Sequence, residues 1–185
     1  NKNLDSAIYT ASGGARWEIS GNTTGEFLVG YQHIRFTHAA VGQPGPVLSV
    51  FRRDQDSFDS LYMMGRLLWS PISQLKLTLQ PYRTIQQTVV AGTAFFTATG
   101  INLSAAYPLG TRMELTTNLG YEKDEFSSPA SGTSPTPPRT DTLKNAAIGM
   151  NYRAVRWLGV GLQYIFEDRS STDGVFSYRA STAML

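Results

Sequence analysis

Residues 112–121 read RMELTTNLGY, and their side chains change character at every step. Met113 and Leu119 fall in one phase of this alternation, whereas Arg112 and Glu114 fall in the other. Successive side chains of a β-strand point to opposite faces of the sheet. A period of two held over ten residues therefore predicts a strand with one apolar face and one polar face.

The same alternation recurs along the whole chain. We expect about nine strands, at residues 6–19, 23–35, 60–69, 75–88, 94–107, 112–121, 143–154, 157–167 and 175–185. They run to about 10–14 residues, against the 5–6 usual in globular proteins, and this length suits a tilted strand that crosses a bilayer. Pro81 and Arg83 fall in the apolar phase of their strand, which predicts a bulge or an interfacial position there.

The connections alternate in length between short and long. Short turns are expected near residues 20–22, 70–74, 108–111 and 154–156, and longer polar segments at 37–56, 127–141 and 169–174. Residues 90–93 are short where a long loop would be expected. Tight turns at one end of a sheet and long loops at the other predict an antiparallel up-and-down meander.

Composition narrows the class of protein. The chain has 185 residues, 16% charged and 11% aromatic, with a net charge of +2 and no cysteine. No stretch approaches the roughly 20 apolar residues of a membrane-spanning helix, which excludes a helical-bundle membrane protein. Without cysteine there are no disulfides and no thiolate metal sites, and the absence of a long basic run argues against nucleic acid as a partner.

The polar faces decide between a soluble β fold and a membrane barrel. They carry many Gly, Ala, Ser, Asn and Gln residues, whereas a solvated strand face usually carries Lys and Glu. Several apolar faces finish in an aromatic residue near a turn, as Trp17, Trp69 and Tyr107 do, which is typical of the aromatic girdles of transmembrane barrels. We therefore expect an all-β transmembrane barrel, with a soluble β fold as the alternative. The residues expected to face lipid are Leu61, Met63, Leu67, Met113, Leu115, Leu119, Ile148, Met150, Leu158, Val160 and Leu162.

The polar phase supplies the candidate pore-lining residues. A charge facing lipid at mid-depth costs about 2–4 kcal/mol, so an arginine in the polar phase fixes which face meets water. These arginines either pair with lumen acids such as Glu18, Glu114, Glu122 and Glu167 or guide anionic solutes and acidic sugar chains. The candidates are Arg16, Arg66, Arg112, Glu114, Asn118, Asn151, Arg153, Gln163 and Arg179.

No motif in the sequence points to catalysis, a metal or a cofactor. His33 and His38 are the two histidines, and without cysteine or a third histidine they do not predict a zinc site. Some outer-membrane enzymes place a Ser-His pair at the barrel wall, and His33 with an unidentified serine represents that interpretation. We expect no catalytic residues, no metal and no cofactor.

Two runs carry a family resemblance. Residues 14–31, GARWEISGNTTGEFLVGY, and residues 158–168, LGVGLQYIFED, resemble the strand–turn–strand unit of the putative β-barrel porin family. That family includes the EpsL-type outer-membrane barrels encoded with exopolysaccharide secretion systems. The resemblance implies the outer membrane of Gram-negative bacteria, with outer-membrane lipid, polysaccharide and periplasmic secretion components as partners. Such barrels are usually longer and often end in an aromatic residue, whereas this sequence ends in Leu185.

Three functions follow from this interpretation. The first is a porin-like channel that serves export of surface polysaccharide, and the second is a structural or partner-binding barrel with a closed lumen. The third is a lipid-modifying enzyme. Residues 1–185 are expected to form a single barrel domain that is part of a larger barrel, because about nine strands are seen whereas bacterial single-chain barrels carry even numbers.

Overall fold

The structure, a computed structural model, describes residues 6–19, 21–36, 57–88, 95–126 and 138–185, which form a single antiparallel sheet. No helix among these residues is long and apolar enough to cross a membrane. The strands follow one another in chain order, which confirms the all-β up-and-down prediction: β1 (Ser6–Ile19), β2 (Thr23–Phe36), β3 (Ser57–Ile72), β4 (Leu75–Gln87), β5 (Phe95–Leu109), β6 (Met113–Phe126), β7 (Thr140–Val155), β8 (Leu158–Ser171) and β9 (Tyr178–Met184).

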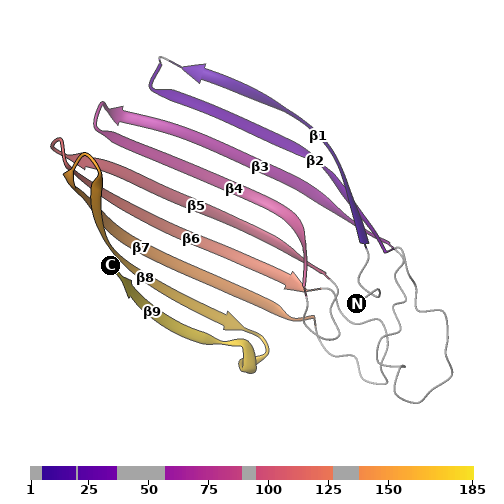
Figure 1. Cartoon of the computed structure of the whole chain (residues 1–185). Coiled ribbons are helices and arrows are strands. Elements are labelled where there is room, and N and C mark those ends of the chain that lie inside the picture. Colours follow the sequence, from indigo (N-terminus) through magenta and orange to yellow (C-terminus); the bar gives the residue numbers. More distant parts are fainter. Residues whose placement is uncertain (1–5, 20, 37–56, 89–94, 127–137) are drawn as a thin grey trace.

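The sheet is curved and open (Figure 1). Within the described residues β1 pairs with β2 alone and β9 pairs with β8 alone, so these two strands form opposite edges. An open edge leaves backbone donors and acceptors that hydrocarbon cannot satisfy. The open sheet is therefore consistent with part of a barrel, and the assignment of residues 1–185 to a single domain stays a prediction.

The two ends of the sheet differ in their connections. At the turn end, tight turns join β1 to β2, β3 to β4, β5 to β6 and β7 to β8, and Gly21 (φ 63°) and Gly110 (φ 78°) supply the left-handed conformation in two of them. At the loop end, β8 is joined to β9 through a short 3-10 helix, η3 (Gly174–Phe176). The expected loop at 37–56 and the short connection at 90–93 lie outside the described residues. A second expected loop, 127–141, ends earlier than predicted because β7 already begins at Thr140. The third, 169–174, begins later than predicted because β8 continues to Ser171.

The strand register sorts the side chains onto two faces. Residues directly opposite each other in an antiparallel pair point to the same face. Leu67 is opposite Leu79, Leu79 is opposite Leu103, and Leu103 is opposite Leu119, so these four leucines share what we call the outer face. All eleven residues predicted to face lipid lie on this outer face. The opposite, polar side is called the inner face.

The phase predicted for the last strand is wrong. Tyr178 and Arg179 are opposite Arg169 and Asp168, and Asp168 lies in the same phase as outer-face Tyr164. Tyr178, Ala180 and Met184 therefore lie on the inner face, and Arg179 lies on the outer one. A shift of one residue moves every side chain of a strand to the other face, and the register of β9 on β8 fixes which face each side chain takes.

Pro81 is accommodated without the predicted bulge. The β3–β4 register is the same on both sides of it, and the irregularities lie instead at the turn end, between Trp69 and Ile72 and between Arg153 and Val155. Proline has no N–H to donate to a neighbouring strand, and the pairing between β3 and β4 is interrupted between Met64 and Leu67, next to Pro81. Gly65 lies opposite, and a Cβ there would come 2.9 Å from the proline ring.

A small core closes over the inner face at the loop end of β2 to β5. Strand β4 stays paired with β5 up to Gln87 after its pairing with β3 has stopped at Arg83. This extension reaches back to β2, where the Gln32 Oε1 atom accepts hydrogen bonds from Ile85 N (2.9 Å) and Thr84 Oγ1 (3.1 Å). Ile34 and Phe58, which belong to the inner phase of β2 and β3, pack there against Ile85 and Phe95. Ile85 and Phe95 continue the outer phase of Arg83 and Thr99, so it is this side of the β4–β5 extension that faces β2.

Glycine lets long side chains lie flat across the inner face. Tyr82, Gly100 and Glu122 are opposite one another on β4, β5 and β6, and the Tyr82 hydroxyl donates to the Glu122 carboxylate across the glycine. A Cβ on Gly100 would come 2.6 Å from the Tyr82 ring and 2.9 Å from the backbone oxygen of Tyr121. The missing side chain thus makes room for a bond that spans three strands.

This geometry predicts that Gly100→Ala destabilises the sheet. The new methyl group must displace both Tyr82 and backbone, and overpacking of this kind costs about 1–3 kcal/mol. Gly13→Ala is the matched control, because a Cβ at Gly13 would meet nothing within 4 Å. Thermal unfolding in detergent, followed by heat-modified gel mobility, should show a lower midpoint for Gly100→Ala alone. Equal midpoints for the two variants would contradict the close approach.

Neighbouring positions on one strand test the two faces. Leu119→Arg places a charge on the outer face and should reduce stability in liposomes by about 2–4 kcal/mol, because that face meets hydrocarbon. Asn118→Arg adds the same side chain to the inner face of the same strand and should change stability little. Denaturant unfolding in lipid vesicles measures both, and a larger loss for Asn118→Arg would reverse the assignment of faces.

Candidate functional site on the inner face

A row of polar residues crosses the middle of the inner face. It begins with Arg16 opposite Glu26, continues across β3 to β8, and reaches β9 at Ala180. Three charged residues on β1 to β3 are followed by amide side chains on β4, β5 and β7, and Glu167 on β8 is the last polar residue of the row. The row consists of Arg16, Glu26, Arg66, Gln80, Asn102, Gly120, Asn145, Glu167 and Ala180. A face with charges and amides at mid-height requires water or other polar partners.

Eight of the nine candidate pore-lining residues share this face. Arg16 and Arg66 flank Glu26, and Glu114 lies opposite Asn151. The other four are Arg112, Asn118, Arg153 and Gln163. Arg179 is the exception, since the register of β9 places it on the outer face. That the eight line a pore stays a prediction.

The inner-face arginines do not pair with acids as the first interpretation of the sequence suggested. Arg16, Arg66, Arg112 and Arg153 form no ion pair with a described residue. Two of the acids proposed as their partners bind tyrosines instead, because Glu122 accepts from Tyr82 and Glu167 accepts from Tyr178. No described carboxylate therefore neutralises these guanidinium groups by direct contact.

Two hollows lie on the inner side of β4 to β8. The one at the turn end, of about 540 Å³, is lined by Arg112, Glu114, Asn151, Arg153 and Arg156, among others. The other, of about 370 Å³, lies further along the same strands and has Lys76, Asn118 and Gln163 in its lining. Cationic and amide groups therefore line both hollows.

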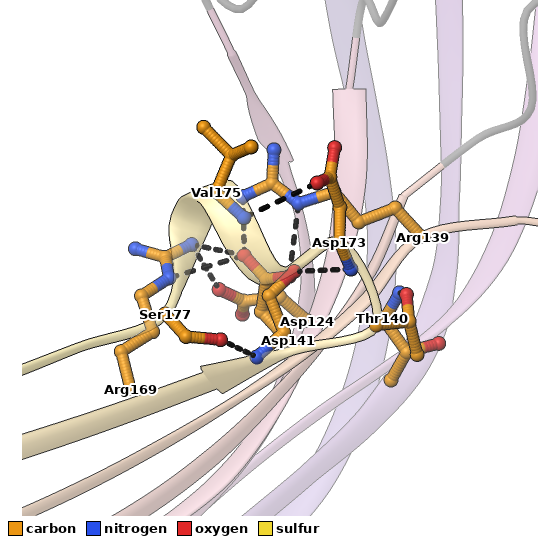
Figure 2. A network of polar contacts seen from close by, with 10 residues as sticks. Asp124, Arg139, Thr140, Asp141, Arg169, Asp173, Val175 and Ser177 are labelled. Carbon is orange, nitrogen blue, oxygen red and sulfur yellow. Dashed lines mark hydrogen bonds and ion pairs between the residues drawn. The ribbon is translucent and has the colours of Figure 1, made fainter.

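An ion-pair network occupies the inner side of the loop end (Figure 2). Asp141 is fully buried and accepts from Arg169 Nε (3.0 Å) and Nη2 (2.7 Å), from Arg139 Nε (2.9 Å) and from the Ser171 hydroxyl. Arg139 also stacks on the rings of Phe126 and Phe176, 4.2 and 3.5 Å from their centroids. The network joins the start of β7 to the end of β8 and to η3.

The second carboxylate of this network has a less favourable environment. Asp124 is opposite Asp141 and 4% exposed, and its Oδ1 atom has no hydrogen-bond partner among the described residues. The nearest cationic group is Arg169, with Nη2 3.6 Å from Asp124 Oδ2. An unpaired buried oxygen is costly, so this carboxylate opposes the stability that the Asp141 pairs provide.

Both carboxylates lie nearer the loop end than Tyr121 and Lys144, which are opposite each other on the outer face of β6 and β7. Because aromatic rings and lysines of this kind sit at the headgroup level, Asp124 and Asp141 lie outside the membrane-spanning part of their strands. Burial raises the pKa of Asp141, but hydrogen bonds from Arg139, Ser171 and Arg169 outweigh it and hold that pKa at about 2. Burial and the charge of Glu122 raise the pKa of Asp124 to about 7, although Arg169 works against this shift. The two shifts have opposite signs.

These features were missed in the sequence for different reasons. Asp141 continues the alternation of residues 143–153, so an earlier start for β7 could have been found. Asp124 likewise continues the inner phase of residues 112–121. Nothing local pairs Tyr82 with Glu122 or joins Gln32 to β4, because those contacts depend on the register of several strands.

The histidine of the enzyme interpretation lies on the outer face. His33 Nδ1 is 2.6 Å from Asp59 Oδ1, and the two residues are opposite each other on β2 and β3. No serine is hydrogen-bonded to this pair among the described residues. The described part of the chain also contains no group of three His, Cys, Asp or Glu side chains that could hold a metal ion. His38 lies outside the described residues.

Comparison with known proteins gives one match. The model of the family described as "Putative beta-barrel porin 2" matches residues 1–185. No curated protein and no solved structure matches the chain.

Asp141→Asn should loosen the loop end. The substitution removes the carboxylate that Arg139 and Arg169 share and leaves Arg169 with Asp124 alone, at 3.6 Å. Breaking a buried ion pair costs about 3–5 kcal/mol. Hydrogen exchange at residues 139–141 and 169–177 should become faster, whereas exchange in the middle of β6 should not. Asp168→Asn is the control, because its pair with Arg179 is exposed on the outer face.

The pH dependence should have two parts. Because the pKa of Asp141 is lowered in the folded state, its stabilisation is lost as pH falls from about 4 to about 2. Because the pKa of Asp124 is raised, stability should also fall as pH rises from about 4 to about 7. Loop-end protection, measured as the exchange rate divided into the intrinsic rate at each pH, that is greatest at pH 8 in the parent chain would contradict these assignments.

Proposed function

Because this chain belongs to the putative beta-barrel porin 2 family, we propose that its sheet forms the wall of an outer-membrane channel that exports surface polysaccharide. The family match and the all-β meander support an outer-membrane porin-like barrel. Export of polysaccharide is the finer step, and the inner face supports it. Short turns of such barrels lie in the periplasm and long loops outside the cell, so the turn end would be the periplasmic mouth.

The polar row across the inner face is the observation that carries this proposal. Its charged and amide groups extend from β1 to β8 at the height where the outer face carries leucine. The buried Oδ1 atoms of Asn102 and Asn145 have no partner among the described residues, and water in a lumen would provide one. Amides, hydroxyls and tyrosine are also groups that sugar hydroxyls can bind.

The arginines favour an acidic polysaccharide over a neutral one. Arg16, Arg66, Arg112 and Arg153 form no ion pair with a described carboxylate, and guanidinium binds carboxylates through two parallel hydrogen bonds. Arg112 and Arg153 meet at the turn end, where the Arg153 N–H donates to the Arg112 carbonyl over 2.8 Å. A uronic acid chain entering from the periplasm would meet these two groups first, and periplasmic secretion components would dock at the same end.

A closed lumen is the second candidate, and the loop-end core supports it. Ile34, Ile85, Phe95 and Phe58 occupy inner-side space where a pore would open to the outside. The Phe58 and Phe95 rings pack with their centroids 4.5 Å apart. If this cluster blocks the passage, the barrel is structural or binds a partner.

An enzyme is the third candidate, and little supports it. The porin family match suggests a barrel without catalytic activity. The His33–Asp59 pair resembles two parts of a hydrolase triad, but the described residues do not supply a nucleophile to it. Lipid hydrolysis that is lost on His33→Ala would revive this candidate.

Conductance in planar bilayers tests the channel. We expect the parent protein to conduct and to prefer anions, and the double variant R16Q/R66Q to lose about two- to fivefold in anion over cation permeability. R179Q is the control, since it removes one positive charge from the outer face. Release of uronic acid oligosaccharides from proteoliposomes should fall with R16Q/R66Q and not with R179Q. Absence of conductance would favour the closed barrel.

A further inference from the structure

Charges on the outer face gather at one end of the sheet. From the turns up to Tyr121 on β6 and Phe166 on β8, no described outer-face strand residue is charged. Beyond that height, cationic side chains stand on β2, β4, β6, β7 and β9, with Arg35 as the one on β2. We call the set on the other four strands, Arg83, Lys123, Lys144 and Arg179, the loop-end patch.

The register brings these four residues into two neighbouring rows. Arg83 and Lys123 share a row and flank Thr99, while Lys144 and Arg179 share the adjacent row and flank Asp168. Lys123 and Lys144 are diagonal neighbours on paired strands, because Tyr121 is opposite Lys144. Side chains in such positions can reach one anionic group together.

Acids neutralise only part of this charge. Lys123 Nζ is 2.7 Å from Glu125 Oε1, and Arg179 Nη2 is 2.6 Å from Asp168 Oδ2. Lys144 forms no ion pair with a described residue, and Arg83 donates to the Thr99 hydroxyl over 2.8 Å. Four cations against two acids leave a net charge of +2 in the loop-end patch.

Hydroxyl groups fill the spaces between the cations. Thr99, Thr142 and Ser170 occupy the same row as Arg83 and Lys123, all on the outer face. Cations with interleaved hydroxyls suit a phosphorylated sugar, because phosphate takes charge-assisted bonds and sugar oxygens take neutral ones. A plain hydrocarbon surface offers neither.

The height of the loop-end patch in the membrane selects the source of such a ligand. Tyr121 and Phe166 are the last aromatic residues before the patch, and such rings sit at the level of lipid headgroups. Long cationic side chains just beyond them extend into the headgroup layer. On the outer face this layer belongs to lipid, whereas a free solute would approach from the water-filled inner side.

We propose that the loop-end patch binds the phosphorylated sugar headgroup of a glycolipid in the outer leaflet, with Lys123 and Lys144 holding the phosphate. Arg83 and the row of hydroxyls contact the sugar. This inference rests on the proposed function only in placing the outer face in an outer membrane. It does not depend on what passes through the barrel.

The test uses the intact protein in neutral maltoside micelles, titrated with diphosphoryl lipid A and with lipid A from which both phosphates have been removed. Bound lipid is counted by native mass spectrometry. We expect the parent protein to prefer the diphosphoryl form. K123Q/K144Q should bind it at least about tenfold more weakly, since each cation near anionic lipid contributes substantially to the binding free energy. R112Q/R153Q removes two positive charges from the inner face and should keep parental affinity.

Two results would overturn the loop-end patch as a lipid site. They are equal binding of the dephosphorylated lipid, or equal loss in R112Q/R153Q, which would indicate attraction to overall charge. Heat-modified gel mobility checks that each variant is folded. Conductance of K123Q/K144Q should match the parent in neutral lipid, so loss of lipid binding and loss of channel activity are read separately.

Discussion

The hydrogen bond between neighbouring strands is the constraint on which this structure depends. In hydrocarbon no water can replace a missing partner, so every backbone donor and acceptor must be satisfied by an adjacent strand. The long ladders meet this requirement, with Arg16 opposite Glu26 and Glu26 opposite Arg66 as one continuous example. Once the ladders are in place, the side chain of each residue is committed to one face.

The two faces then follow different chemical rules. On the outer face, charge is confined to the loop end, whereas the inner face carries arginine and glutamate at mid-height. Glycine serves the inner face by letting a long side chain cross it, as Tyr82 does over Gly100. Among the described residues the buried apolar cluster around Ile34 and Ile85 is small, so the strand ladder is the most extensive interaction that holds the sheet together.

Alternation alone predicted most of this fold. The nine strands, their order and the outer face of Leu61 or Leu162 follow from a period of two, which is a local property. Features that depend on how strands pair with one another could not be predicted from this local pattern. Arg179 was placed on the wrong face because β9 turns Tyr178 and Met184 to the inner face, so its apolar alternation alone indicates the opposite phase from the one that pairing with β8 fixes.

The candidate site was predictable to a similar extent. Arg16, Arg112 and Arg153 share the inner face as their phase indicated, but their lack of acid partners depends on distances that phase does not give. The bridge from Gln32 to β4 arises because β4 leaves β3 at Arg83, and curvature of this kind belongs to the whole sheet. The network around Asp141 required the loop-end strands to be longer than the alternation suggested.

The number of described strands also determines whether strand direction can alternate all the way around a closed ring. In a meander of nine, β1 and β9 point the same way, so these two edges could meet only as a parallel pair. A ring in which every neighbour is antiparallel closes with an odd number of additional strands, whatever polypeptide supplies them. Strand direction alone thus limits the number of strands that could close such a ring, whatever their side chains are.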